Sequence, residues 1–345
     1  MDTPYVSARP NPLNPGNVRS QLLDVLGGFL RTQALHTAAR LGVADIVGHD
    51  PVMVEELAAR VEADPSALHR VMRLLASGGI FCEVAPAAFV STVLSDGLRS
   101  DRPGSVRYMA MLQGSDGYLA ASEMLRCVQT GEPAAETVFG MPFFEHLAGK
   151  SDASDVFNRA MASGASARAA AALRYDWSGA SVVADIGGGN GSLLSALLNA
   201  QTHLSGVVFD LPNVIAEARP VIEAARLSDR CELVGGDFFS DALPAADVYV
   251  LAQILHDWDD ERAVAILRNC RRSLAKGARL LLIEQVLPEG DEPSYAKLLD
   301  LLMLVLLGGK ERTEGEWRAL LRDGGFELVG ITPTPATSLI EATPA

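Results

Sequence analysis

Residues 181–192 read SVVADIGGGNGS, an apolar run that ends in an acid and a series of glycines. The valines before Asp185 are typical of a strand, and SLLSALLNA (192–200) has the spacing of a helix. The glycines form a G-x-G-x-G turn, in which the backbone can approach a ligand closely; they are Gly187, Gly189 and Gly191. The dinucleotide fingerprint needs glycine at 192, where this chain has Ser192, so pyrophosphate binding is disfavoured.

From about residue 176 onward, strand and helix patterns alternate. After the glycine turn come LSGVVFDLP, VIAEARPVIEAARL, CELVGGDFF, DVYVLAQIL, ERAVAILRNCRRSLA and ARLLLIEQVL. Near-continuous apolar strands between amphipathic helices predict a mostly parallel sheet that is covered on both faces. Ligands of such sheets bind at the carboxyl ends of the strands.

Acids follow two of these strands at their carboxyl ends. Asp210 ends VVFDLP, about 20 residues after the glycines, where an acid can accept hydrogen bonds from both hydroxyls of a ribose; the alternative is an N-cap for the following helix. Asp237 and Phe238 follow the third strand in GGDFF. An acid beside an aromatic ring suits an adenine, although an ordinary turn would look the same.

The stretch ILHDWDDERAV (254–264) places an ionisable ring where an apolar strand reaches the surface. His256 is either a solvated turn residue or a base that faces a substrate. Glu284 ends the strand LLLIEQ, and a charge after that apolar run requires a reason. Glu311 in GGKERT could instead be one charge of a solvated segment. Asp259 and Asp260 are expected to cap the helix that follows.

The N-terminal part of the chain, about 18–105, is predicted to be helical with a small hairpin. Two short helices, MVEELAARV and DPSALHRVMRLLASGGIF, precede CEVAPAAFVSTVL, with Asp64 as the expected N-cap of the second helix. Helix, turn, helix and hairpin together predict a winged-helix unit. The second helix carries Arg70 and Arg73, but acids flank it, and a DNA-reading helix would need more positive charge. A packing or dimerising role is therefore favoured.

The composition of the chain limits which kinds of protein it can be. The 345 residues are 48% hydrophobic, carry a formal net charge of -14 and include four scattered cysteines with no zinc-site spacing. The charge argues against non-specific nucleic-acid binding and against an anionic membrane surface, and the cysteines indicate a reducing, cytoplasmic setting. The segment LLDLLMLVLL (298–307) is too short to span a bilayer and is expected to be a buried helix.

These motifs divide the chain into four predicted parts. Residues 1–17 form a flexible N-terminal arm without a secretory signal, and 18–105 form the winged-helix-like domain. Residues 106–175 form a helical connector that contributes to a substrate pocket. Residues 176–345 form the cofactor-binding catalytic domain.

Taken together, the glycine turn, Asp210, GGDFF, LHDWDD and GGKERT resemble an O-methyltransferase family. This is the S-adenosylmethionine-dependent family of plant caffeic-acid-type enzymes and bacterial antibiotic-tailoring enzymes, and the resemblance covers nearly the whole chain. It implies an α/β fold: a Rossmann-like class I methyltransferase domain with a mostly parallel seven-stranded sheet, after a mainly α winged-helix dimerisation domain. It also implies that S-adenosylmethionine is the methyl donor and S-adenosylhomocysteine the product. It further implies a homodimer formed through the N-terminal domain, and no metal.

The resemblance assigns roles to individual residues. His256 matches the catalytic base of the family's HDW motif, and Glu284 and Glu311 match the pair of carboxylates that orients it. The residues implied to hold the donor are Gly187, Gly189, Asp210, Asp237, Phe238 and Gln253. The residues expected at the acceptor are Met161 in FNRAM, Asp257 beside the base and Met303 in LLDLLMLVLL.

One position departs from the plant members of the family. They have lysine four residues before the base, where this chain has Ala252. A side-chain contact with the donor is lost there, which leaves the backbone or Gln253. The reaction class is hardly affected.

The implied reaction is methyl transfer to a hydroxyl, for which the protein must supply proximity, alignment and removal of the acceptor's proton. A histidine of ordinary pKa near 6.5 lies about 3.5 units below a phenol of pKa near 10, or roughly 4.8 kcal/mol. A nearby carboxylate would raise the basicity of the ring. Two alternatives stay open: a winged-helix regulator that senses a ligand, which needs no base, and a nicotinamide-dependent oxidoreductase, which Ser192 disfavours. No short motif specifies the acceptor, for which the abundant Leu, Met and Ala suggest an apolar, flat molecule.

Overall fold

The computed structural model describes residues 18–275 and 277–345, and the predicted arm, 1–17, lies outside them. The chain divides into two compact units. The first comprises residues up to Ser122 together with Phe144–Ser163, and the second comprises Glu123–Phe143 together with Gly164–Ala345. The predicted connector, 106–175, therefore contributes helices to both units.

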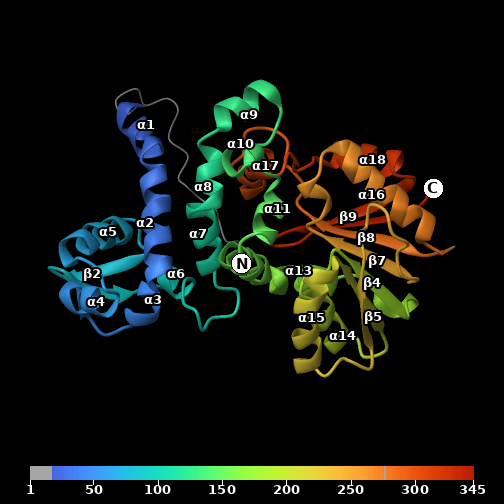
Figure 1. Cartoon of the computed structure of the whole chain (residues 1–345), viewed down its shortest axis with the longest axis horizontal. Coiled ribbons are helices and arrows are strands. Elements are labelled where there is room, and N and C mark those ends of the chain that lie inside the picture. The colour runs from blue at the N-terminus through green and yellow to red at the C-terminus, as the bar shows by residue number, and fades with distance from the viewer. Residues whose placement is uncertain (1–17, 276) are drawn as a thin grey trace. The chain divides into compact units, whose positions relative to one another are not determined.

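The first unit is mainly helical (Figure 1). Its helices are α1 (Val18–Leu26), α2 (Gly28–Leu41), α3 (Val43–Ile46), α4 (Val54–Arg60), α5 (Pro65–Ser77), α6 (Val93–Asp96), α7 (Arg107–Gly114), α8 (Asp116–Ala121), α11 (Phe143–Ala148, which begins at the boundary) and α12 (Ser151–Ser163). A small antiparallel sheet has the strand order β1-β3-β2, with β1 (Val52–Met53), β2 (Phe81–Ala85) and β3 (Ala88–Ser91). The two predicted helices and the hairpin are thus present, and Asp64 caps α5 by accepting the N–H of Ala67 at 2.8 Å.

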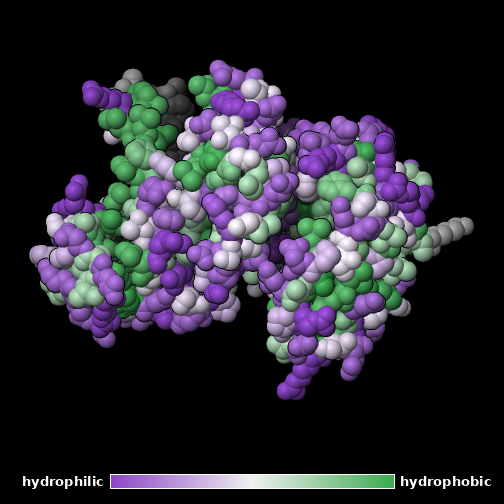
Figure 2. All heavy atoms as spheres, viewed as in Figure 1, coloured by the Kyte–Doolittle hydropathy of each residue, from purple (hydrophilic) through white to green (hydrophobic). Residues whose placement is uncertain are grey.

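The apolar faces of α2, α4, α5 and the hairpin enclose one core. Helix α1 and the first turns of α2 do not share in it, and Figure 2 shows apolar side chains along them. The exposed side chains are Val18, Leu22, Leu23, Val25, Leu26, Phe29 and Leu30, each at least half exposed. A run of this length on one surface is typical of a protein–protein contact.

The second unit is built on a seven-stranded sheet with the order β6-β5-β4-β7-β8-β10-β9. Its strands are β4 (Val182–Ile186), β5 (Ser205–Asp210), β6 (Cys231–Gly235), β7 (Val248–Ala252), β8 (Arg279–Glu284), β9 (Phe326–Pro333) and β10 (Ser338–Pro344). The first five in this order are parallel, and β10 is antiparallel to both neighbours. The predicted sheet, mostly parallel and seven-stranded, is confirmed.

Helices cover both faces of this sheet (Figure 1). One face packs against α16 (Asp260–Ser273) and α18 (Glu314–Asp323), and the other against α13 (Ala165–Ala172), α14 (Ser192–Ala200) and α15 (Pro212–Ala224). In β8, Leu280 and Leu282 face the first layer, while Leu281 and Ile283 face the second. Because both faces are buried, the strands are continuously apolar and do not alternate.

Helix α17 (Tyr295–Leu306) corresponds to the apolar stretch LLDLLMLVLL. It packs beside α9 (Met124–Thr130), and the N–H of Ala134, just before α10 (Ala135–Phe139), donates to the carbonyl oxygen of Val305 at 2.9 Å. Met303 is buried, but Leu298 and Leu301 are 54% and 43% exposed, so the helix is buried on one face. Within 18–275 and 277–345, none of the helices combines the length and the apolar character that a membrane crossing requires.

Candidate active site

The glycine turn joins β4 to α14 at the carboxyl edge of the sheet. Gly187, Gly189 and Gly191 have φ angles of 72°, 58° and 73°, which favour glycine. A Cβ atom at Gly187 would lie 2.5 Å from Ile254, whereas a Cβ at Gly189 would meet nothing within 4 Å. The backbone of Gly189 therefore borders open space, and a ligand can approach it there.

Asp210, at the end of β5, is joined to this turn. Its Oδ2 accepts the N–H of Gly189 at 2.8 Å, and its Oδ1 accepts the N–H of Leu211 at 2.7 Å. It does not act as the N-cap of α15, because the capping residue is Leu211 and makes no side-chain bond. Burial raises the pKa of Asp210, and the two amide hydrogen bonds oppose that shift. The carboxylate is thus held against the glycine turn.

Asp237 and Phe238 follow β6 on the same edge. The Asp237 carboxylate accepts the N–H of Phe239 at 2.8 Å, which forms the ordinary turn that was the alternative interpretation. The Phe238 ring lies 5.0 Å from Phe239 and 6.2 Å from Trp258, centroid to centroid, and its edge is 3.6 Å from the Cβ position of Gly187. An aromatic cluster therefore lies beside the glycine turn. Asp237 can form an ordinary turn while the ring of Phe238 remains able to stack on an adenine.

The side chain of Gln253 is engaged by a residue that the sequence analysis did not single out. Arg168, on α13, donates from Nη1 to Oε1 of Gln253 at 2.8 Å. Burial lowers the pKa of Arg168, while the carboxylates of Asp185 and Glu284 act in the opposite direction. Gln253 itself has a φ of 57°, which is unusual for a residue other than glycine. An arginine within an alanine-rich helix is the signal in the sequence that marks Arg168.

Asp185 lies beneath the glycines and is 1% exposed. Burial raises its pKa to about 7, and Asp210 raises it further while Arg168 lowers it. Among the described residues, its Oδ2 has no hydrogen-bond partner. A buried acid without a full set of partners is typical of a functional site.

His256 lies in a short 3-10 turn, Leu255–Asp257, directly after β7, and is buried. Its Nδ1 lies 2.7 Å from Oε1 of Glu311, and its Nε2 lies 3.3 Å from Oδ1 of Asp257. Burial alone would lower the pKa of His256, but the carboxylates of Asp257, Glu284 and Glu311 raise it to about 10. The interpretation of His256 as a solvated turn residue is excluded, since the ring is enclosed by acids.

Glu284 and Glu311 contact the histidine turn differently. Glu311 meets the ring, whereas Oε1 of Glu284 accepts the backbone N–H groups of Ile254 at 3.0 Å and Leu255 at 2.9 Å. From sequence Glu284 was the more persuasive partner of His256; the structure gives the ring contact to Glu311. Burial raises the pKa of Glu284 to about 7, and His256 lowers it. Both glutamates are almost fully buried, so neither belongs to a solvated run.

This trio also has the composition of a metal site. One ligand atom from each of His256, Glu284 and Glu311 lies within 4.8 Å of the others. A divalent ion there would displace the 2.7 Å hydrogen bond between His256 and Glu311, and Oε1 of Glu284 already accepts two amides. Hydrogen bonding accounts for the arrangement.

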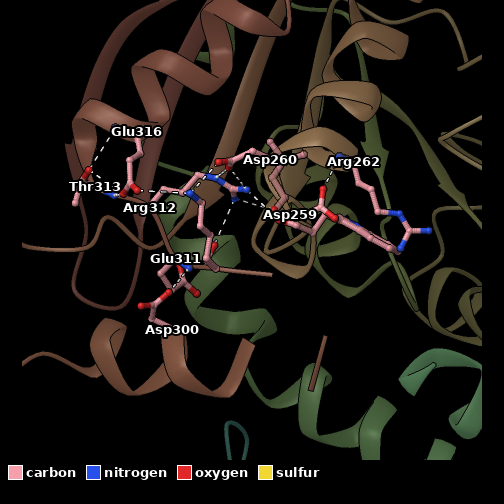
Figure 3. A network of polar contacts seen from close by, with 11 residues as sticks. Asp259, Asp260, Arg262, Asp300, Glu311, Arg312, Thr313 and Glu316 are labelled. Atoms are coloured by element: carbon pink, nitrogen blue, oxygen red, sulfur yellow. Dashed lines mark hydrogen bonds and ion pairs between the residues drawn. The ribbon is translucent and has the colours of Figure 1, made fainter. Parts of the chain in front are cut away.

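Arg312 pairs with Asp260 (Figure 3) and fixes the backbone on both sides of His256. Its fully buried guanidinium donates to the carbonyl oxygens of Leu255 and Trp258, both at 2.9 Å, and to Asp260 through Nε and Nη2 at 3.0 and 2.9 Å. Asp259 caps α16 by accepting the N–H of Arg262, as expected. Asp260 was expected to cap as well, but its carboxylate pairs with Arg312 because the cation lies within reach of the first helical turn.

The three predicted acceptor residues lie in different places. Asp257 is in the histidine turn, where burial raises its pKa to about 6 and His256 lowers it. Met303 is on α17, three positions after Asp300, which accepts the N–H of Glu311 at 2.9 Å. Met161 is on α12 in the first unit, so its role stays a prediction.

Family models match most of the chain. Residues 122–327 match an O-methyltransferase domain, and 23–99 match an O-methyltransferase dimerisation domain. A phenazine O-methyltransferase of Lysobacter antibioticus is 45% identical over 94% of this chain and 96% of its own length. An O-demethylpuromycin-O-methyltransferase of Streptomyces alboniger is 36% identical over 94% and 89%.

A solved structure extends the likeness to bound ligands. The O-methyltransferase NcsB1 from neocarzinostatin biosynthesis, in complex with S-adenosylmethionine and 2-hydroxy-5-methyl naphthoic acid, superposes with a TM-score of 0.79. It is 35% identical, and the match covers 91% of this chain and 96% of that one.

Proposed function

Because this chain belongs to the O-methyltransferase family, we propose that His256 is the general base with which it methylates a hydroxyl of an aromatic natural product. The chain is an S-adenosylmethionine-dependent O-methyltransferase. The observation that carries the proposed role of His256 is its 2.7 Å contact with Glu311, at the same sheet edge as the glycine turn. An acid-enclosed histidine beside a nucleotide-type pocket suits proton removal from an acceptor hydroxyl.

The residues at the glycine turn fit the donor. Open space above Gly189, the held carboxylate of Asp210 and the aromatic ring of Phe238 match a ligand with a ribose and an adenine. We assign donor binding to the six predicted residues, Gly187, Gly189, Asp210, Asp237, Phe238 and Gln253. We add Arg168, whose partly buried guanidinium suits the carboxylate of the donor's amino-acid end.

The environment of His256 supplies the basicity that the reaction requires. The donor contributes an electrophilic methyl group on a positively charged sulfonium. With Nδ1–H donated to Glu311, the Nε2 atom is the one that accepts the acceptor's proton. The carboxylates around His256 raise its pKa, which narrows the gap that an ordinary histidine would face with a phenol near 10. The positive charge of the bound donor's sulfonium opposes protonation of the His256 ring, so Nε2 stays available to accept a proton.

The acceptor class rests on the relatives and on the apolar helix α17. The relatives named above are methyltransferases of a phenazine and of O-demethylpuromycin, and the solved neighbour holds a naphthoic acid. We propose a flat aromatic acceptor with a phenolic hydroxyl, with Asp257 and Met303 at its pocket; a role of Met161 at the acceptor stays a prediction from the family resemblance. Glu284 would hold the turn of His256 in place through the amide of Leu255.

We further propose a homodimer formed through residues 18–105. The dimerisation-domain match and the exposed apolar side chains of α1 support it. The four cysteines are unpaired, which supports action in the cytoplasm. A DNA-binding or nicotinamide-dependent role is not favoured, since the family and the enclosed base both point to methyl transfer.

The direct test is a methyl-transfer assay with radiolabelled S-adenosylmethionine. Hydroxylated phenazines, naphthoic acids and benzoic acids serve as acceptors, and products are identified by a mass increase of one methyl group. Transfer that requires His256 supports the proposal. Transfer at the full rate in H256A would overturn the role of the base, and binding of duplex DNA or of reduced nicotinamide cofactor in its place would favour the alternatives.

A further inference from the structure

Asp300 is the one charged residue in the apolar stretch 298–307 of helix α17. Its side chain is half-buried, and its Oδ1 accepts the backbone N–H of Glu311 at 2.9 Å (Figure 3). Within the described part of the chain, this is the interaction that the carboxylate makes, and no cation pairs with it. A carboxylate that is partly shielded from water on an apolar helix is unusual, so the hydrogen bond to Glu311 requires an explanation.

Residues 309–312, which we call the strap, lie against the backbone of the histidine turn. A Cβ atom at Gly309 would lie 2.0 Å from the carbonyl oxygen of His256, so only glycine fits. The N–H of Lys310 donates to that same carbonyl oxygen at 2.9 Å. Glu311 meets the ring of His256, and Arg312 donates to the carbonyl oxygen of Leu255. Four consecutive residues thus determine where the ring lies.

The position of Glu311 depends on few contacts. Its Oε1 meets the His256 ring, and its Oε2 has no hydrogen-bond partner among the described residues. Its backbone N–H is satisfied by Asp300, and the residue is 2% exposed, so water cannot readily take the place of that carboxylate. Without Asp300 a buried N–H would be left unpaired, and the chain would shift to satisfy it.

We propose that Asp300 is a positioning residue: by holding the backbone of Glu311 it orients the His256 ring, and it couples α17 to the base. This inference rests on the proposed role of His256. Met303 lies three positions after Asp300, so the two side chains share one side of α17. An acceptor that presses on Met303 would therefore act on the same helix that anchors Glu311. A displacement of α17 by the acceptor would therefore change the position of Glu311 and, through it, the orientation of the His256 ring.

The test compares D300A with D300N in the full-length enzyme. Asparagine keeps an oxygen that can accept the N–H of Glu311, whereas alanine removes it. We expect D300A to lower kcat about tenfold or more with the KM for S-adenosylmethionine within about twofold of wild type, because the donor site is intact while the base is misaligned. D300N should keep kcat within about threefold.

A matched control separates positioning from stability. Asp64 accepts the N–H of Ala67 at 2.8 Å as the cap of α5, so D64A removes the same kind of bond far along the chain from His256. D64A and D300A should lower the melting temperature alike, but only D300A should lower kcat. In the proton NMR spectrum, the low-field Nδ1–H signal of His256 should persist in D300N and shift upfield or vanish in D300A. If D300A does not fold, D300L replaces it, because leucine is close to aspartate in shape and has no acceptor.

Two results would overturn the inference. One is wild-type kcat in folded D300A or D300L. The other is an equal loss of kcat in D300N and D300A, which would assign the effect to the charge of Asp300. Both are distinct from failure of the proposed function, because that failure would appear as full activity in H256A whatever the behaviour of Asp300.

Discussion

Nδ1 of His256 lies 2.7 Å from Oε1 of Glu311, although 55 positions separate the two residues along the chain. This contact orients the ring and helps to raise its pKa to about 10. It is made possible by residues 309–312, which follow α17 and lie against the histidine turn. The consequences of this arrangement can be measured.

Removal of the base should affect turnover and not donor binding. H256A and H256Q are expected to lower kcat by about 10² or more, because a general base contributes roughly 10² to 10⁴-fold. The Kd for S-adenosylmethionine, measured by calorimetry, should stay within about threefold of wild type, since the ring of His256 contacts Glu311 and Asp257, which we do not assign to the donor. A large loss of donor affinity would instead place His256 in the donor site.

Asp210 should act in the opposite way. D210A removes a carboxylate that we assign to the ribose hydroxyls, and hydrogen bonds to charged groups are worth about 1.5–3 kcal/mol. The Kd for S-adenosylmethionine should therefore rise by about 10 to 10²-fold, while kcat at saturating donor changes little. An unchanged Kd would exclude the ribose role, and Asp210 would then serve only to brace Gly189.

Glu311 should control the pH dependence of the reaction. Its carboxylate stabilises the protonated ring of His256, so E311Q should lower the pKa of His256 and move the corresponding limb of the kcat/KM profile to lower pH. The plateau rate should fall by about tenfold, because the base becomes weaker. E314Q is the matched control, since Glu314 is exposed and pairs with Arg318 on α18. An unshifted limb in E311Q would show that the profile reports another group.

Asp185 should make stability depend on pH. Burial raises its pKa from 3.8 to about 7, so between these values the folded state binds more protons than the unfolded state. Its contribution to the free energy of unfolding is present below about pH 4 and is lost as the pH rises to about 7. D185N removes this titration. The difference in the free energy of unfolding between wild type and variant should therefore change by roughly 1 kcal/mol per pH unit between about pH 4 and pH 7. Urea unfolding of both proteins at several pH values measures this difference. If the free energies of unfolding of wild type and D185N change in parallel with pH, the prediction is wrong.

The apolar surface of α1 should be a subunit contact. Val25 and Leu26 are 75% and 67% exposed, and a double change of both to glutamate would place charges in any interface there. We expect the variant to be a monomer by light scattering at concentrations where the wild type is a dimer. V329E is the matched control, since Val329 on β9 is 54% exposed and lies outside the dimerisation domain. An unchanged mass in the double variant would place the subunit contact elsewhere.

Much of this molecule could be predicted from local patterns. The alternation of strands and helices, the glycine turn, the Asp64 cap and the carboxyl-end positions of Asp210 and His256 all follow from short-range periodicity. These features depend on residues within one or two turns of each other, and the backbone geometry of helices and strands limits them to few arrangements. The assignment of the family followed from the same motifs.

Which side chains meet was decided by the tertiary structure. Sequence reasoning preferred Glu284 as the partner of His256, passed over Arg312 and Arg168, and gave Asp260 a capping role. Arg168 reaches Gln253 across 85 positions, and Asp300 reaches Glu311 across the end of a helix. A buried polar group must find a partner wherever the packed chain provides one, so its partner depends on the packing of distant elements and not on spacing along the chain.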